Sequence, residues 1–320
     1  MHYARAASFT AACLLAGAVA AQSYPTRPVR LLVAQTAGGS ADIVARAVAQ
    51  KIGEALGQQF VVDNRGGASG IIATDITAKA APDGYTLLIT SSTFGVNPGL
   101  YKKLPYDPFR DIAPITLLAA APNILVVHPS LPVRTVKELT ALARARPGYL
   151  NFGSSGNGGS PHLAGELFKL RTGVNMVHVP FKGAPAAQTA LIAGEIHLNF
   201  SSMPSAIGHV RAGRMRAIAV TGAKRSPATP ELPTMMEAGI KDFETSAWQG
   251  FFAPARTPAA VVTTLNREAV RAMLSPELKD RLSPEGAEAV GNSPEEFRAW
   301  LKQEITKWTA VIKAANVHID

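Results

Sequence analysis

Cysteine is nearly absent from this chain of 320 residues, and the single one, Cys13, lies near the N-terminus. We expect the first 22 residues to be removed, which excludes disulfides, thiol catalysis and thiolate metal sites from the mature protein. No later stretch has the ~20 strongly apolar residues that a membrane span needs. Charged residues make up 17 % and hydrophobic residues 47 %, which indicates a core-forming chain of two domains at roughly 150 residues each.

Motifs of several enzyme classes are also missing. There is no P-loop lysine motif and no His-Glu-x-x-His. A nucleophile elbow fails because Asn157 stands where its last glycine is needed, and a dinucleotide fingerprint fails because Pro161 replaces its third glycine. The histidines after residue 22 are scattered without metal-ligand spacing. We therefore predict no catalytic residue, no cofactor and no metal.

The positive charge is spread along the chain. The net charge is +9, yet the longest basic runs are dipeptides such as Lys102-Lys103. Nucleic-acid binders concentrate such charge on one face or arm, so we expect no nucleic-acid partner. A dispersed positive charge gives a weak field that favours small anions.

The first residues have the pattern of a secretory signal peptide. Arg5 precedes an apolar run over residues 6–21 that ends in the small residues Ala18-Val19-Ala20. A lipoprotein anchor at Cys13 is disfavoured because Thr10 occupies a position usually held by a large aliphatic residue. We predict that residues 1–22 are a cleaved signal and that the mature protein is exported.

Short apolar, β-branched runs alternate with amphipathic stretches along the chain. This alternation predicts an α/β fold with parallel-rich sheets flanked by helices. The predicted strands are 29–34, 60–62, 86–90, 124–128, 150–152, 176–179, 196–200 and 215–220. Helices are predicted over 41–56, after a capping box at Thr135, from an N-cap at Ser160, from Thr257 and after a capping box at Ser293.

Two extended segments, 115–123 and 246–254, suggest where the chain crosses between domains. If both cross, residues 23–121 and 250–320 form a discontinuous domain 1 and residues 122–249 form domain 2. Such an interrupted domain has a two-stranded hinge.

Six loops that follow predicted strands are rich in glycine and hydroxyl side chains: 35–42, 64–70, 91–97, 153–160, 181–184 and 201–204. Ligands in parallel α/β sheets bind beyond the carboxyl ends of the strands. Glycine permits close backbone approach, and helix N-termini supply free amides and a positive dipole end. The loops come from both domains and suit a carboxylate or phosphate enclosed between them.

Several individual side chains allow two interpretations. Asp42 either stabilises a helix start or binds a ligand ammonium, and Arg65 either pairs with an aspartate or forks onto a carboxylate. His162 is a packing or a contact residue, Lys182 a solvated lysine or the counter-charge of the cleft, and Trp248 a core residue or a cleft wall.

These segments, in this order, resemble the Bug family, the extracytoplasmic solute receptors of tripartite tricarboxylate transporters. The resemblance spans the chain after residue 23. Its motifs are YPTRPVR at 24–30, AGGSAD at 37–42, VDNRGGA at 62–68, PDGYTLL at 82–88, LPYDP at 104–108, HLAGELF at 162–168, HVPFKG at 178–183, PTMMEAG at 233–239 and APARTP at 253–258.

The resemblance implies a two-domain type II periplasmic-binding-protein (Venus flytrap) fold without enzymatic activity. It also implies a periplasmic monomer that closes on an amino acid or a di- or tricarboxylate and delivers it to membrane subunits of the transporter. The residues that it and the loops assign to ligand binding are Thr36, Ala37, Gly38, Gly39, Ser40, Asp42, Ser91, Ser92, Asn97, Ser154, Ser155, Ser160, His162, Lys182, Gly183 and Ser202. One departure is Gln35-Thr36, where the family usually has an aromatic residue, and it points to a more polar ligand.

Two alternatives use the same cleft. One is a receptor that signals to a membrane sensor, which the sequence does not distinguish from a transport receptor. The other is an exported α/β hydrolase that relies on Ser155 and His162, for which no third triad residue presents itself.

Overall fold

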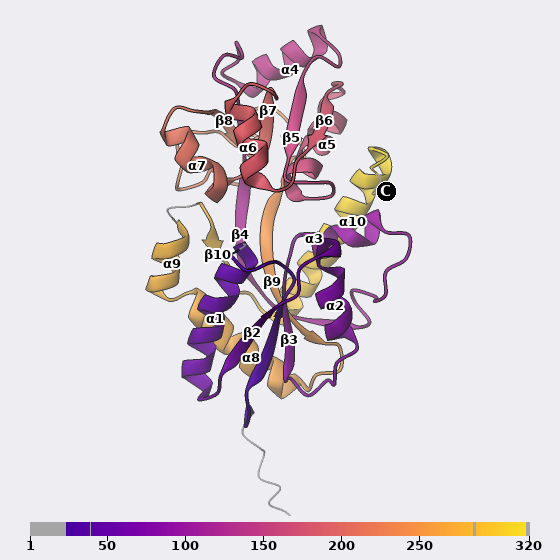
Figure 1. The fold of residues 1–320 in the computed structure, drawn as a ribbon, viewed down its shortest axis with the longest axis vertical. Coiled ribbons are helices and arrows are strands. Elements are labelled where there is room, and N and C mark those ends of the chain that lie inside the picture. The colour runs from indigo at the N-terminus through magenta and orange to yellow at the C-terminus, as the bar shows by residue number, and fades with distance from the viewer. Residues whose placement is uncertain (1–23, 39, 284–285, 318–320) are drawn as a thin grey trace, which may run out of the picture.

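The computed structural model describes residues 24–38, 40–283 and 286–317. The predicted signal peptide, residues 1–22, and the predicted ligand residue Gly39 lie outside these ranges. The described chain forms two lobes joined at a waist (Figure 1). Within the described ranges, no helix combines the length and the apolarity that crossing a membrane requires.

The strands form one continuous sheet that runs through both lobes. Its order is β2-β1-β3-β9-β4-β7-β5-β6, with β8 and β10 also paired to β4. The strands are β1 (Val29–Val33), β2 (Phe60–Asn64), β3 (Thr86–Ser91), β4 (Ile112–Val127), β5 (Asn151–Ser154), β6 (Val177–Pro180), β7 (Leu198–Ser202), β8 (Arg216–Val220), β9 (Ser246–Pro254) and β10 (Glu288–Ala289).

Two long strands, β4 and β9, connect the lobes. They pair antiparallel from Ile112 with Pro254 to Pro122 with Ser246. From Asn123 onward β4 instead pairs with β7 and β8. We call the part that contains β1–β3, β9, β10 and the first part of β4 lobe 1, and the part that contains β5–β8 and the end of β4 lobe 2. The residue limits of two separate domains stay a prediction.

Helices cover both faces of the sheet in each lobe (Figure 1). Lobe 1 carries α1 (Ser40–Leu56), α2 (Ile71–Ala78), α3 (Thr93–Leu100), α8 (Ala259–Met273), α9 (Pro276–Leu282), α10 (Pro294–Ala314) and the 3-10 turn η1 (Ala68–Gly70). Lobe 2 carries α4 (Val136–Ala145), α5 (Ser160–Thr172), α6 (Ala184–Ile192) and α7 (Met203–Arg211).

The pairing of the strands is mixed. β1 is parallel to β2 and β3, and β5 is parallel to β6 and β7, as the alternation of strands and helices predicts. The crossing strand β9 is antiparallel to β3, and β4 is antiparallel to each of its partners. In each lobe the carboxyl ends of the parallel strands face the waist, because β1, β3, β5, β6 and β7 each lead into a helix there.

Local sequence explains most helix starts. The capping boxes at Thr135 with Glu138 and at Ser293 with Glu296 are both formed, which confirms those predictions. Ser160 is not an N-cap as predicted, because Gly159 occupies the cap position and Ser160 is the first helical residue. The helix predicted from Thr257 has Pro258 as its cap and starts at Ala259.

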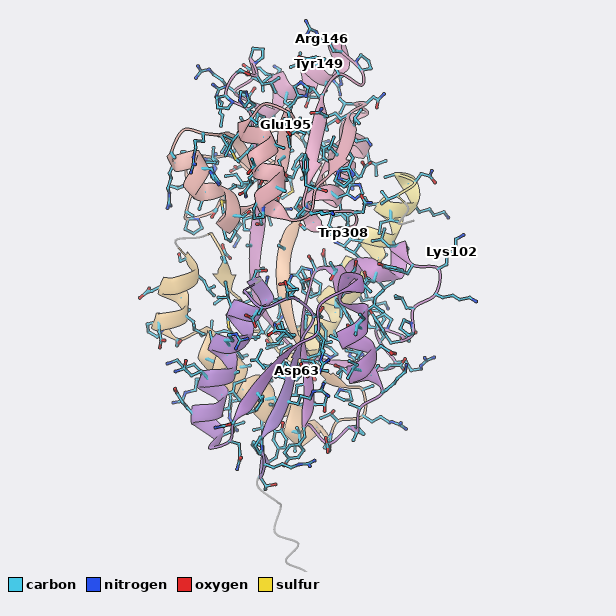
Figure 2. All side chains as sticks on the ribbon, viewed as in Figure 1. Asp63, Lys102, Arg146, Tyr149, Glu195 and Trp308 are labelled. Carbon is cyan, nitrogen blue, oxygen red and sulfur yellow. The ribbon has the colours of Figure 1, made fainter. Side chains whose placement is uncertain are left out.

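The last helix does not belong to lobe 1 alone. The end of α10 shares a core with lobe 2, in which Trp308, Val311 and Ile312 pack together with Phe152 and Leu163. Figure 2 shows Trp308 at the level of the waist, where α10 passes from one lobe to the other. The lobes are therefore held together by the packing of α10 as well as by the two crossing strands.

Candidate ligand-binding site

A cleft of about 700 Å³ lies at the waist between the lobes. Lobe 1 contributes residues 34–38, Ser40, Gly66, Gly67, Ser69, Gly70, Ser91, Ser92 and Thr93, and lobe 2 contributes Ser155, Gly159, Ser160, Pro161, Gly183, Ala184, Pro185, Asn199, Ser201 and Ser202. The crossing strands supply Asn123 and residues 247–249. A larger groove of about 1040 Å³ runs along α1 and β2, but lobe 1 alone lines it, away from these helix starts.

Small residues dominate the lining of the cleft, and none of the described ones carries a formal charge. Among the described residues that line it there is no Asp, Glu, Lys, Arg or His. Hydroxyl and amide side chains alternate with glycines instead. A ligand in this cleft therefore meets hydrogen-bond donors and backbone dipoles rather than counter-ions.

Six α-helices, three from each lobe, begin at the cleft. The first residue of α1, Ser40, lines it, as do the N-cap residues of the other five: Gly70 of α2, Ser92 of α3, Gly159 of α5, Gly183 of α6 and Ser202 of α7. The first-turn amides of a helix lack intrahelical partners, and the dipole places about half a positive charge there. Their convergence makes the cleft an anion-binding environment without any basic side chain.

Asp42 anchors the loop between β1 and α1 from below. Its carboxylate, 3 % exposed, accepts hydrogen bonds from Gly38 N at 2.9 Å, Arg46 Nε at 3.0 Å and Asn64 Nδ2 at 2.9 Å. Burial raises the pKa of Asp42, but these hydrogen bonds outweigh burial and lower it overall. The carboxylate is thus committed to shaping the loop, while Thr36, Ala37, Gly38 and Ser40 line the cleft.

The loop between β5 and α5 has two layers. Ser155, Gly159 and Ser160 line the cleft, whereas Ser154 is fully buried beneath them. Ser154 Oγ accepts a hydrogen bond from Gly156 N at 3.2 Å and donates one to Gly156 O at 3.0 Å. Ser154 is therefore part of the support of the loop rather than of its surface.

Two stacked histidines lie under the same loop. The rings of His162 and His178 are 3.7 Å apart at their centroids and inclined by only 10°. Nδ1 of His162 accepts a hydrogen bond from Gly158 N at 3.0 Å, and Nε2 of His178 lies 2.7 Å from Ser154 Oγ. Burial lowers the pKa of His162 to about 4, and burial together with His162 lowers the pKa of His178 to about 3.

The remaining predicted ligand residues are distributed as follows. Ser91, Ser92, Gly183 and Ser202 line the cleft, while the exposed Lys182 does not. Asn97 is buried outside the lining and donates to Ser69 O at 3.1 Å. Asp42, Ser154 and His162 likewise lie behind the lining. That any of these residues contacts a ligand stays a prediction.

Three polar residues of the lining lie outside the six loops singled out in the sequence analysis: Asn123, Asn199 and Gln249. Each lies inside a strand rather than in a loop after one. The available signal was a polar residue within a buried apolar run, as in the segment LNFSS of β7. Because side chains alternate along a strand, Asn199 and Ser201 project from the same face.

Several polar atoms at this wall have no partner in the described structure. They are Asn123 Oδ1, Asn199 Oδ1, Ser201 Oγ and Trp248 Nε1. Trp248 is at once a cleft wall and a core residue, because its ring packs edge-on against Phe297 and Trp300. Unsatisfied buried polar atoms are costly, and these four could each bind a polar group of a ligand in the cleft.

The described structure does not bring together Ser155 and His162, the pair of the hydrolase alternative. Nδ1 of His162 accepts a hydrogen bond from Gly158 N, and Nε2 lies 3.8 Å from Glu166 Oε1. Neither ring nitrogen is hydrogen-bonded to Ser155 in the described structure. No group of three His, Cys, Asp or Glu residues with metal-binding geometry occurs among the residues described. Arg65, the other candidate for a carboxylate fork, is paired with Asp63 at 2.9 Å.

Comparisons with known proteins agree with this architecture. The model of the tripartite tricarboxylate transporter family receptor matches residues 44–317. Protein BugT of Bordetella pertussis is 36 % identical over 313 residues, which cover 97 % of this chain and 96 % of that protein.

Two of the similar structures were solved with an organic acid. Rpa4515 of R. palustris with adipate is 40 % identical, with a TM-score of 0.82 over 92 % of this chain and 99 % of that one. MatC (Rpa3494) from Rhodopseudomonas palustris with bound malate is 31 % identical, with a TM-score of 0.78 over 90 % and 100 % of the two chains.

These matches confirm the resemblance seen in the sequence motifs and the two-domain periplasmic-binding-protein fold. The family consists of solute receptors. The chain therefore belongs to the receptor family of the tripartite tricarboxylate transporters, together with Bug proteins such as BugT.

Proposed function

We propose that this protein is a periplasmic receptor that holds a small organic carboxylate in the cleft between its lobes without transforming it. One observation carries the proposal: six α-helices from both lobes begin at a cleft whose described lining has no charged side chain. Helix N-termini bind anions through free amides and the aligned dipole. The similar proteins solved with adipate and with malate support a carboxylate as the anion.

The ligand contacts in this proposal come from the described lining. Thr36, Ala37, Gly38 and Ser40 hold the ligand from lobe 1, with Ser91 and Ser92 beside them. Ser155, Ser160, Gly183 and Ser202 hold it from lobe 2. Since contacts from both lobes are made only when the lobes approach, the ligand shifts the equilibrium toward the closed form.

The closed form is what a partner recognises in this proposal. The family to which the chain belongs supplies receptors to tripartite transporters, so membrane subunits of such a transporter are the expected partner. Residues 1–22, the predicted signal peptide, would direct export to the periplasm, where such a receptor works as a monomer. Capture of those membrane subunits by the ligand-loaded protein, but not by the ligand-free protein, would be the supporting result.

Binding is tested by calorimetric titration of protein that has been refolded to remove ligand retained from expression. Adipate, malate, a tricarboxylate and an acidic amino acid form the panel. We expect saturable 1:1 binding of at least one acid, with a rise in melting temperature from mass action. If none of the panel, and no acid found by mass spectrometry in the protein as purified, binds or stabilises it, the proposal fails.

Trp248 offers an independent optical readout. Its indole lines the cleft, whereas Trp300 and Trp308 are absent from the described lining. We expect ligand to change the tryptophan emission of the protein, and a Trp248→Phe variant to lose most of that change. A response of unchanged size in this variant would place the ligand elsewhere.

A further inference from the structure

We propose that His162 and His178, acting as neutral groups, hold the loop of residues 154–160 in the shape that presents it to the ligand. This inference rests on the proposed function of the cleft. His162 is then a positioning residue that acts through Gly158, not a ligand contact. The sequence alone left open whether His162 packs or binds.

The hydrogen bonds under the loop form a closed set. Gly158 N donates to His162 Nδ1, and Gly156 N donates to Ser154 Oγ. The Ser154 hydroxyl donates to Gly156 O, so the 2.7 Å contact with His178 is satisfied when His178 Nε2 donates to Ser154 Oγ. Backbone groups on both sides of Asn157 are thereby fixed from below, which leaves Ser155, Gly159 and Ser160 facing the cleft.

The stack itself is held by packing. Phe152 on β5 lies 5.0 Å from the His178 ring and 6.5 Å from the His162 ring. Gly165 on α5 makes room for it, because an added Cβ there would lie 2.1 Å from Phe152 Cε2. The rings therefore have little freedom to turn away from the loop.

The surroundings of the stack favour neutral imidazoles. On α5, Glu166 lies 3.8 Å from His162 Nε2, but Lys169 binds the same carboxylate at 2.8 Å and offsets its charge. β4, β5 and β7, which pack against α5, contain no titratable side chain. On α10, which also packs against α5, Glu304 is paired with Lys307.

Neutrality is required by the hydrogen bond to the loop. A nitrogen that carries a proton does not accept one, so Nδ1 of His162 accepts from Gly158 N only while it is unprotonated. Burial, which lowers the pKa of His162 to about 4, keeps that nitrogen free at any pH near neutrality. Two cationic rings 3.7 Å apart would also repel each other.

A matched pair of variants separates the acceptor from the ring. His162→Asn and His162→Leu both remove the imidazole and are close in size, but only Asn has an oxygen near the position of Nδ1. We expect His162→Leu to bind adipate or malate about tenfold more weakly, because the loop is then competent in only about a tenth of the molecules. His162→Asn is expected to stay within about threefold of the parent protein.

His197→Asn is the control. That histidine is also partly buried and its Nδ1 also contacts a strand, at 2.8 Å from Asn151 Oδ1 and 3.2 Å from Asn151 N, but it lies outside the cleft lining. We expect its affinity to be unchanged. Equal affinities of His162→Leu and His162→Asn would overturn the inference, even if both are less stable than the parent protein.

The pH profile distinguishes positioning from direct contact. The ratio of the dissociation constants of the parent protein and of His162→Asn should be constant from pH 8 to 5.5, since the ionisation of the ligand cancels in it. If His162 instead bound the ligand as an imidazolium, affinity of the parent protein alone would fall as pH rises through the pKa of that group. Such a pH-dependent ratio would overturn the inference.

Amide hydrogen exchange tests the loop without any ligand. Gly156 and Gly158 should exchange faster in His162→Leu than in His162→Asn, and equal rates would contradict the inference. If His162→Leu does not fold, His162→Ala replaces it, since alanine also leaves Gly158 N without its acceptor. Failure of the parent protein to bind any acid would refute the proposed function, while the exchange measurement would still decide the role of His162.

Discussion

The two cleft loops of the protein are held in shape by different chemistry. In lobe 1, residues 35–42 are fastened by the ionised Asp42, which accepts from Gly38, Arg46 and Asn64. In lobe 2, residues 154–160 are fastened by Ser154 and by the stacked His162 and His178. Both supports are nearly buried, and both leave short polar groups facing the cleft.

The comparison shows how an anion site avoids competing charges. Asp42 is negative, but three donors, of which Arg46 is cationic, stabilise its charge, and it is absent from the lining. The support in lobe 2 carries no charge at neutral pH. The field at the cleft therefore comes from the helix N-termini, and the two supports can be weakened separately.

The largest effect is expected from Asp42→Ala. This change leaves Gly38 N and Asn64 Nδ2 without a hydrogen-bond acceptor in a buried site. Hydrogen bonds to a charged group contribute about 1.5–3 kcal/mol each. We expect the free energy of unfolding to fall by about 3 kcal/mol, measured by urea denaturation. Asp42→Asn, which keeps one acceptor, should cost about half as much. A loss below about 0.5 kcal/mol for Asp42→Ala would show that the carboxylate does not support the loop.

Gly165→Ala probes the packing beneath the loop of lobe 2. The added Cβ would lie 2.1 Å from Phe152, and overpacking of this kind costs about 2 kcal/mol. The matched control is Gly208→Ala on α7, where a Cβ meets nothing within 4 Å. That change should be neutral or stabilising by up to about 1 kcal/mol, because alanine is the better helix former. Similar unfolding energies for both variants would contradict the packing of Phe152 on α5.

Acid should weaken the two supports in different pH ranges. His162 and His178 titrate near 6.5 when unfolded, but their folded pKa values are about 4 and about 3. Between these limits the unfolded chain binds more protons than the folded one. The free energy of unfolding therefore decreases as the pH is lowered, by about 1.4 kcal/mol per pH unit for each histidine. The lowered pKa of Asp42 gives stability that is present above about pH 3.8 and lost only below it.

Denaturation from pH 7 to 4 measures this difference. His162→Asn should remove the contribution of one histidine from the slope of the free energy of unfolding against pH. Burial also lowers the pKa of His197, so that residue contributes to the slope in the same direction. A parent protein whose stability is constant over this range would show that the stacked rings are protonated in the folded state.

The smallest effect is expected from removal of the ion pair between Arg46 and Asp42. The Arg46 side chain is 56 % exposed, and exposed ion pairs contribute little. We expect Arg46→Gln to cost about 0.5 kcal/mol in the same urea assay, because Gly38 and Asn64 still bind the carboxylate. A loss as large as that of Asp42→Ala would mean that Arg46, rather than the two buried donors, carries the support.

The sequence predicted the secondary structure and the crossing strands better than the ligand-binding site. Strand and helix alternation, two capping boxes and the two crossing segments depend on residues close together in the chain, and they are found where expected. Ser160 shows the limit of this reasoning. Its hydroxyl accepts from Asn123 Nδ2 at 2.7 Å, a contact across 37 residues that no local pattern contains.

The supporting residues were assigned least well for the same reason. Asp42, Ser154 and His162 lie in the right loops, but sequence position does not tell which side of a loop a side chain faces. The stacking of His178 on His162 joins β6 to α5 and depends on tertiary packing. Asn199 was overlooked because polar residues inside buried strands were not considered as cleft residues.

The most direct test is a crystal structure of the refolded protein with the acid that it binds. Our account predicts a carboxylate whose oxygens lie within hydrogen-bond distance of first-turn amides from both lobes, at Ser40 or Thr93 and at Ser160. His162 should still accept from Gly158 in that complex. A carboxylate held by lysine or arginine side chains, or by one lobe alone, would contradict it.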